Sequence, residues 1–487
     1  MNNSRTEIYD WLTKLGVTFD RLVPQAGGSS VTRFHRTKGR GLGLVSSIYR
    51  ECLKNPNIDF VWNIQVTSLI IERGRVRGVR GKEMRTDKSR EFRSRVVVLA
   101  TGGFQSNLAL VREYWPKSLN FPDRILVGSG VNSVGSGLEI AKAAGAVLYN
   151  LDHQWNYPWG LPDPRYPGGN RGLNARGPRA PWVNAQGKRF VNESAAPKYS
   201  LPALLSQKPA TYWMILDEQI KPLFSVSGSD WGDFKTVQRV IFDNPDLVKT
   251  ASTIEELAAK VGLPASDLTQ TIQRYNEMVA NNNDTDFGRF GPNAPPPAGT
   301  PGPYYKLEKP PFYALQFFPL TRKSMGGVMI DLSCRVVDQQ KHPLPGLYAV
   351  GELTGLAGIN GKAGLEGTFP GPSVITGRVA GRALLAELKA AKKLTPSPAL
   401  AVVPERTITT ANTAGNQQCS KCHNLEALIA QPRNSYWHFE RAHRAILERK
   451  YDCAQCHAEM TAQYKAETHK INRLAQINSC VFCHVAE

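Results

Sequence analysis

The chain has 487 residues, enough for two or three domains. Its hydrophobic content of 41% is ordinary, and no apolar run reaches the roughly 18 residues that a membrane-spanning helix needs. The formal net charge is +19. Because the basic residues are scattered and form no polybasic block, the charge argues against nucleic-acid binding and favours a docking surface for an acidic partner.

The first 150 residues alternate between helix and strand. The predicted elements are helices over 6–15 and 41–53, strands over 60–64, 66–80 and 95–100, and a loop followed by a helix over 135–145. The second strand folds into a hairpin at Arg73-Gly74. The third strand is short and apolar, and it runs directly into Thr101-Gly102-Gly103. Glycines at the end of a strand allow a phosphate or a ring to approach the backbone closely.

Residues 151–310 differ in composition, because Pro and Gly become more frequent and Trp and Tyr cluster at 155–159. We predict a second lobe here, with an exposed Pro-rich loop over 292–303. The elements predicted after this lobe are strands over 313–318, 326–330 and 347–350, and a helix over 370–391. Residues 392–418 are rich in Pro, Thr and Ala and are interpreted as a linker.

Residues 419–487 contain three Cys-x-x-Cys-His pentads, each of which is the attachment signature of a c-type haem. The two thiols bond to the haem vinyl groups, and the adjacent imidazole becomes an axial iron ligand. With 8 Cys in 487 residues, composition does not explain three such pentads. The predicted attachment residues are Cys419, Cys422, Cys453, Cys456, Cys480 and Cys483, and the adjacent axial ligands are His423, His457 and His484.

Three further histidines complete the count for bis-histidine haems: His438, His443 and His469. His438 and His443 are five positions apart in a predicted helix, so their side chains point in directions that differ by about 140°. They would therefore face different haems. The alternatives are surface exposure for these histidines and a zinc ribbon for the pentads, although zinc would not require a histidine after every second cysteine. The tail has few aliphatic residues, so the haems are expected to supply most of its core.

Five segments together carry a resemblance to a known family. They are 27–43 with its His35-Arg36, 97–104, 187–193, 325–330 and 346–355. They resemble the FAD-binding flavoprotein of fumarate reductase and succinate dehydrogenase, especially the soluble flavocytochrome c relatives. The resemblance implies an α/β (α+β) FAD-binding domain in two parts, 1–150 and 311–391, with a capping lobe inserted over 151–310. The haem pentads add a small, mostly helical triheme cytochrome c domain over 419–487.

The resemblance also implies which residues hold the flavin. Thr101, Gly102 and Gly103 are expected near the dinucleotide, Glu352 on the ribityl chain, and Ser373 and Val374 near the flavin ring. In the alternative interpretation Glu352 is only an acidic residue at the end of a strand. FAD and three covalently bound haems would together make the chain an electron-transfer protein.

The chain departs from the family near its beginning. The Gly-x-Gly-x-x-Gly turn that cradles a pyrophosphate is missing, and Gly128-Ser-Gly130 lacks the βαβ unit that would let it serve instead. An export signal is also missing, although c-type haem predicts a periplasmic protein. We expect one missing N-terminal segment to explain both, through a start site placed too late or a divided gene. Otherwise a second subunit, a separate flavin half, donates the strand and helix.

The second departure concerns fumarate. At the positions where the family has the residues that reduce fumarate, this chain has Tyr157, Leu173-Asn174, Pro197 and Lys323 instead. Where the family has the arginine that binds a carboxylate, the only basic residue is Lys362. Fumarate reduction needs cationic clamps on two carboxylates and an acid that protonates carbon. Their loss argues against this substrate. The turn over 364–374 is closer to the tricarballylate and ketosteroid dehydrogenase relatives.

The candidate catalytic residues are Tyr157, Tyr199, whose pKa the neighbouring Lys198 could lower, and Lys323. A tyrosine in a Trp-rich lobe is otherwise part of the core or the rim. Two functions remain open. The first is a periplasmic FAD oxidoreductase that acts on a carbon–carbon bond beside a carbonyl or carboxylate, and that exchanges electrons through the haems with a quinol-linked or soluble cytochrome partner. The second is an electron-transfer or binding module with an inactive flavin lobe.

Overall fold

The computed structural model describes residues 4–23, 34–177, 179–292, 294, 302–359 and 369–392. Residues 393–418 of the predicted linker, Lys362 and most of the Pro-rich loop lie outside these ranges, whereas Lys392 is the last residue of a helix. So do all the predicted haem residues: Cys419, Cys422, His423, His438, His443, Cys453, Cys456, His457, His469, Cys480, Cys483 and His484. No helix within the described ranges is both long and apolar enough to cross a bilayer.

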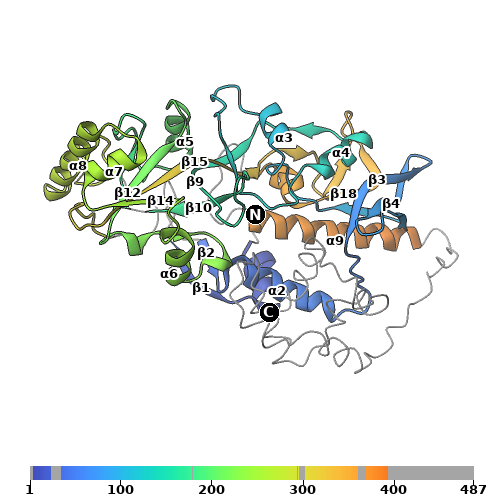
Figure 1. Ribbon diagram of the computed structural model, residues 1–487. Helices are drawn as coiled ribbons and strands as arrows, with labels where there is room; N and C mark the ends of the chain where they lie inside the picture. The colour runs from blue at the N-terminus through green and yellow to red at the C-terminus, as the bar shows by residue number, and fades with distance from the viewer. Residues whose placement is uncertain are drawn as a thin grey trace, which may run out of the picture.

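A three-stranded sheet lies between two layers of helices. β6 (Val97–Leu99) runs parallel to β18 (Pro343–Ala349), and β17 (Arg335–Val337) pairs with β18 in the antiparallel direction. On one face, Tyr348 packs with Ala380 of α9 (Pro370–Lys392), the long orange helix in Figure 1. On the other face, β18 packs in one apolar cluster with α3 (Leu108–Glu113) and α4 (Ser136–Ala143). This is the layered architecture of an α/β fold.

An antiparallel meander is attached to this core. It consists of β3 (Ile64–Glu72), β4 (Arg75–Glu83) and β5 (Ser89–Arg93). Arg73 and Gly74 form the turn between the first two strands with φ values of 50° and 72°, as a tight hairpin requires. A methyl group on Gly346, in β18, would lie 2.6 Å from the carbonyl oxygen of Val76 in β4. The meander is therefore held closely against the core sheet.

The other half of the described chain is built around an eight-stranded sheet. Its strands are β7 (Leu126–Val127), β9 (Gln154–Pro162), β10 (Gly172–Arg176), β11 (Trp182–Val183), β12 (Tyr212–Asp217), β13 (Ser225–Val226), β14 (Val248–Ala251) and β15 (Phe312–Ser324). β15 pairs with β7, β9, β12 and β14 and is buried along most of its length, which explains its nearly continuous apolar sequence. Because β7 and β15 belong to it, the sheet extends beyond 151–310. The predicted domain boundaries remain a prediction.

Shorter elements complete the fold. They are η1 (Arg5–Asp10), α1 (Trp11–Lys14), β1 (Phe19–Val23), β2 (Phe34–Thr37), α2 (Arg40–Leu53), β8 (Leu148–Tyr149), α5 (Pro197–Leu205), η2 (Lys221–Leu223), η3 (Ser229–Trp231), α6 (Phe234–Val237), η4 (Gln238–Phe242), α7 (Ile254–Val261), α8 (Ala265–Ala280), β16 (Gly327–Val328), η5 (Gly351–Leu353) and η6 (Gly355–Gly358). α7 and α8 lie at the end of the molecule opposite the meander (Figure 1). Glu7 fixes η1 to α9 through Arg378 and Arg382, at 3.0 and 2.9 Å.

Most of the predicted elements form. The helices over 6–15, 41–53 and 370–391, the hairpin at Arg73-Gly74, and the strands that end near Thr101 and Glu352 are confirmed. The strand predicted over 60–64 is wrong, since residues 60–62 are not in a strand and β3 begins at Ile64. Phe60 and Trp62 stack on each other at 5.7 Å, and Phe60 contacts Tyr49 of α2. This apolar segment has no partner strand among the described residues.

Candidate functional site

The glycine loop after β6 meets the end of β15. A methyl group on Gly103 would lie 2.3 Å from Ser324 Oγ and 2.7 Å from Glu352 Oε1, so only glycine fits there. The backbone N–H of Phe104 donates a hydrogen bond to Ser324 Oγ at 3.1 Å. A methyl group on Gly137, in α4, would lie 1.9 Å from Thr101 Oγ1. Gly102 has a φ of 75°, which favours glycine. The loop is therefore enclosed by backbone and short polar side chains.

Glu352 lies in η5, shortly after β18, and contacts the predicted residue Lys323 and its neighbour Ser324. Its carboxylate accepts a hydrogen bond from the backbone N–H of Ser324 at 3.0 Å. Lys323 Nζ lies 3.5 Å from its other oxygen, and the two side chains are only partly exposed. Glu352, three residues after the end of β18, thus pairs with the lysine that lies two residues before Met325-Gly326-Gly327.

The N-terminal turns of α9 complete this arrangement. The hydroxyl of Thr376 accepts a hydrogen bond from the N–H of Gly351 at 2.9 Å, which fixes the helix to the end of β18. Ser373 lies beside the same glycine, because a methyl group on Gly351 would be 3.6 Å from Ser373 Oγ. Val374, the next residue of the helix, is half-buried. The residues expected to hold FAD therefore gather at the carboxyl ends of the parallel strands β6 and β18, where α/β sheets bind their ligands.

The buried amide of Gln105 tests whether this region suits a ligand. Gln105 is completely buried next to the glycine loop, and neither of its amide atoms has a hydrogen-bond partner among the described residues. Together with the glycine loop, this unpartnered amide fits a bound cofactor. A cavity of about 550 Å³ lies between β3 and α4, but its lining shares no residue with the glycine loop, Glu352 or α9 and does not bear on the cofactor. The sequence alone does not indicate Gln105.

The structure brings two of the three catalytic candidates together. In the pairing of β9 with β15, Tyr157 lies opposite Leu320 and Lys323 opposite Trp155, so Tyr157, Trp155 and Lys323 share one face of the sheet. Tyr157 is 4% exposed and packs between Trp155 and Trp159, with ring centroids 6.3 and 5.0 Å away. Phe369 lies beneath Lys323 Nζ, at 5.8 Å. Tyr157 and Lys323 thus lie among aromatic rings, and Lys323 forms an ion pair with Glu352.

Tyr199 is placed differently. It lies in the first turn of α5 and is 63% exposed, while Leu201, Leu204 and Leu205 of the same helix face the interior. The ammonium group of Lys198 lies 4.7 Å from its ring, which is the proximity expected from the sequence. The structure leaves Tyr199 on the surface, and its catalytic role remains a prediction.

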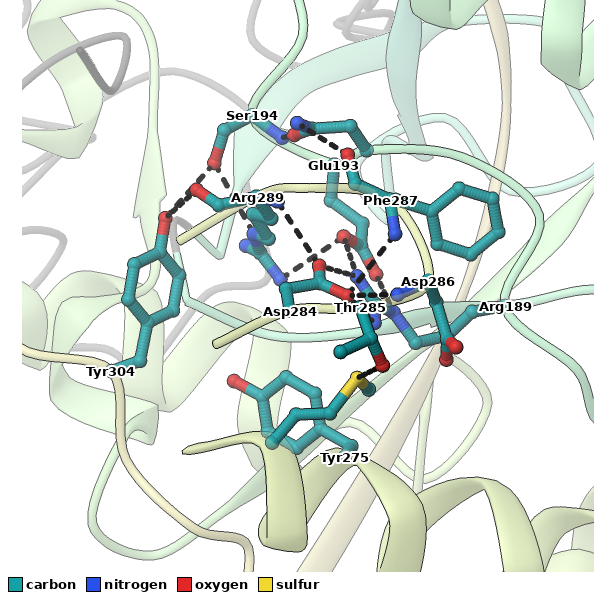
Figure 2. Close-up of polar contacts among 12 residues, drawn as sticks. Arg189, Glu193, Ser194, Tyr275, Asp284, Thr285, Asp286, Phe287, Arg289 and Tyr304 are labelled. Carbon is teal, nitrogen blue, oxygen red and sulfur yellow. Dashed lines mark hydrogen bonds and ion pairs between the residues drawn. The ribbon is translucent and has the colours of Figure 1, made fainter. Parts of the chain in front are cut away.

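A buried ion network in the lobe was not predicted from the sequence. Arg189 binds Glu193 through two hydrogen bonds of 2.8 Å and Asp284 through bonds of 3.1 and 2.8 Å, and Arg289 lies 3.3 Å from Glu193 (Figure 2). All four side chains are at most 3% exposed. Burial alone would raise the pKa of Asp284, but the hydrogen bonds and charge of Arg189 lower it overall. Asp284 is 95 residues from Arg189, so spacing could not reveal this pair.

Comparison with known proteins decides the family. Residues 3–372 match the FAD binding domain family. The chain belongs to this family. It is 31% identical over 379 residues to an NADH:acrylate oxidoreductase of Vibrio harveyi, which covers 77% of this chain and 35% of that protein. It is 32% identical over 377 residues to a fumarate reductase (cytochrome) of Shewanella frigidimarina, covering 76% and 60%.

A third relative belongs to a different group of enzymes. A KsdD-like steroid dehydrogenase of Mycobacterium tuberculosis is 30% identical over 429 residues, covering 75% of this flavoprotein and 74% of the relative. Among solved structures, the open conformation of a flavocytochrome c3 fumarate reductase matches with a TM-score of 0.60 and 26% identity, over 78% of this chain and 62% of that one. The flavoprotein thus spans about a third to three fifths of the length of the first two relatives.

Proposed function

We propose that this flavoprotein is an FAD-dependent oxidoreductase that exchanges hydride with a carbon–carbon bond beside a carbonyl or carboxylate. The supporting observation is the convergence of the glycine loop 101–103, Glu352, Ser373 and the Lys323–Tyr157 face in one region. The names of the relatives agree with this class, because they refer to acrylate, fumarate and steroids.

Each part of the region has a distinct task in this proposal. FAD, when bound, supplies the hydride chemistry. Thr101, Gly102 and Gly103 allow its close approach, and Glu352 and the first turns of α9 orient it. Lys323 holds a proton beside the substrate, and the carboxylate of Glu352 fixes the position of its ammonium group. The ring of Phe369 lies 5.8 Å from Lys323 Nζ and covers one side of this partly exposed pair.

The same geometry disfavours fumarate as the substrate. A dicarboxylate needs two unengaged cationic clamps, whereas Lys323 is already paired with Glu352. Tyr157 is packed among tryptophans, and Asn174 lies within β10. A neutral enone or a monocarboxylic enoate would place less negative charge beside Tyr157 and Lys323 than the dicarboxylate fumarate does.

The electron route is the second part of the proposal. We infer that three c-type haems carry single electrons between the flavin and a quinol-linked or soluble cytochrome partner in the periplasm. The support is the three pentads and the three further histidines of residues 419–487. A separate flavin half is a further proposed partner. In the part of the chain that the structure describes, β6 is an edge strand of its sheet and its central residue Val98 is 40% exposed, which supports this partner. The alternative is an electron-transfer module with an inactive flavin lobe.

An anaerobic titration tests the proposed activity. The holoprotein, reduced with dithionite, is mixed with acrylate, cinnamate, a 3-ketosteroid enone or fumarate, while the flavin and haem absorbance is followed. We expect reoxidation by at least one enoate or enone and none by fumarate. Reoxidation by fumarate would overturn the substrate assignment, and haem bands without releasable FAD would favour the inactive module.

A pair of variants tests the residue assigned to the proton. Lys323→Met is expected to lower the reoxidation rate by about 100-fold, in the range of general acid catalysis. Lys309→Met, at an exposed lysine without an ion pair among the described residues, is the control and should keep the wild-type rate. Equal rates in Lys323→Met and the control would remove Lys323 from the mechanism.

A further inference from the structure

The meander β3–β5 concentrates positive charge. Residues 72–95 hold ten Lys or Arg and four Asp or Glu, a net charge of +6 out of +19 for the whole chain. Nine of the ten basic residues are exposed, and only Arg75 is half-buried, where it pairs with Glu387 at 2.6 Å. These ten residues lie within 24 consecutive positions, so the expectation of scattered basic residues is wrong for this segment, and the fold places them on one small sheet.

Part of this charge is not neutralised locally. Arg93 pairs with Glu72 at 2.6 Å, Arg80 with Glu91 at 2.8 Å, and Lys82 with Asp87 at 2.9 Å. Four exposed basic residues have no ion pair within the described part of the chain: Arg73, Arg77, Lys88 and Arg95. The meander therefore presents an excess of unpaired cations, mostly arginine, to solvent.

The surface also has features of a protein interface. Ile71 and Met84 are 48% and 55% exposed among these charges. Arginine and methionine are enriched in interfaces, where apolar contacts are surrounded by a polar rim. The interspersed acidic residues break the run of positive charge, which suits the mixed surface of a protein better than the uniform charge of a nucleic acid or an anionic bilayer.

The position of the meander connects it with the flavin region. β4 packs against β18 and β6, the strands that lead to Glu352 and to the glycine loop. In Figure 1 the meander projects at the end of the molecule far from α7 and α8. A protein bound there would lie near the FAD-binding half and away from the lobe helices.

We propose that the meander β3–β5 is the docking surface for an acidic electron-carrying protein. The docking is inferred from the charge and exposure of this sheet, and the electron-carrying role rests on the proposed function. Each docked carrier would transfer one electron to the haem chain, and two successive dockings would supply the two electrons of one hydride.

Binding of the full-length holoprotein to immobilised, oxidised flavodoxin, an acidic electron carrier, tests the docking without turnover. The variant Arg73→Gln/Arg77→Gln/Lys88→Gln/Arg95→Gln removes the unpaired cations of the meander. The control Lys208→Gln/Lys235→Gln/Arg239→Gln/Lys309→Gln removes four exposed basic residues of the lobe, so the net charge changes equally. At about 50 mM salt we expect the association rate constant to fall roughly 10-fold in the first variant and less than about 2-fold in the control.

Several outcomes decide the proposal. A steep decrease of the wild-type rate constant with added salt, and a shallower one in the meander variant, would support it. Equal losses in the two variants, or no binding by the wild type, would overturn it. Tighter meander-dependent binding to phosphatidylserine vesicles or to duplex DNA would also overturn it. Because no substrate is present, intact binding with absent turnover would count against the proposed function alone.

Discussion

At the scale of single residues, the glycine loop predicts how a substitution at Gly103 changes FAD binding. Gly103→Ala would place a methyl group 2.3 Å from Ser324 Oγ and 2.7 Å from Glu352 Oε1, so the loop or these two side chains must shift. We expect the affinity for FAD to fall by at least about 10-fold, or roughly 1.4 kcal/mol. Fluorescence titration of the apoprotein with FAD measures this change.

The control is a glycine with open space around it. Gly377 lies on the exposed face of α9, and a methyl group there would meet nothing within 4 Å. Gly377→Ala should leave FAD binding unchanged and should stabilise the helix slightly, because alanine has the higher helix propensity. Unchanged FAD affinity in Gly103→Ala would show that the cofactor does not depend on this loop.

At the scale of elements, the network around Arg189, which forms an isolated bridge with Val183 of β11, connects this part of the lobe with the loop after α8 (Figure 2). Arg189→Met would leave Glu193 with its contact to Arg289 and would leave Asp284 buried with backbone N–H donors but without the guanidinium of Arg189. Removing one partner of a buried ion pair costs about 3–5 kcal/mol, which we expect in the free energy of unfolding measured with urea. Arg274→Met breaks an exposed pair with Asp286 and should have a much smaller effect.

The same network predicts how stability depends on pH. The pKa of Asp284 is lowered in the folded protein, so its contribution is present above the unfolded pKa, near 4, and is lost as the pH falls through the folded value. The urea midpoint of the wild type should therefore decrease below about pH 4. Asp284→Asn should be less stable at pH 7 and should show a weaker decrease on acidification. Parallel pH curves for the two proteins would contradict this role.

The elements also show what the sequence could predict. The β3–β4 hairpin followed from Arg73-Gly74 between apolar runs, and the strands before Thr101 and before Glu352 followed from short apolar segments that end in glycine. The strand predicted at 60–64 had strand-forming apolar residues, but strand pairing depends on a neighbouring strand that local sequence cannot specify. The proximity of Lys323 and Glu352 depended on the register of β15 and the path of β18.

At the scale of the whole molecule, the main prediction concerns the haems. Each haem is expected to be held by the two thiols of one pentad, so Cys453→Ala/Cys456→Ala should lower the haem content from three to two per chain. Intact mass and the pyridine haemochrome spectrum of exported protein measure this content. FAD content should not change, because the residues proposed to hold FAD all lie within 101–374. Loss of all haem, or no loss, would contradict independent attachment.

The haem variant also separates the two halves of the reaction. Dithionite can reduce the flavin directly, so the substrate half-reaction should keep its rate when one haem is absent. Reduction by an external cytochrome must pass through the haem chain, one electron at a time, before the flavin holds the two electrons of a hydride. We therefore expect turnover with a cytochrome donor to fall while the substrate half-reaction is preserved. A parallel loss of both rates would mean that the tail supports the flavin fold itself and does not only conduct electrons.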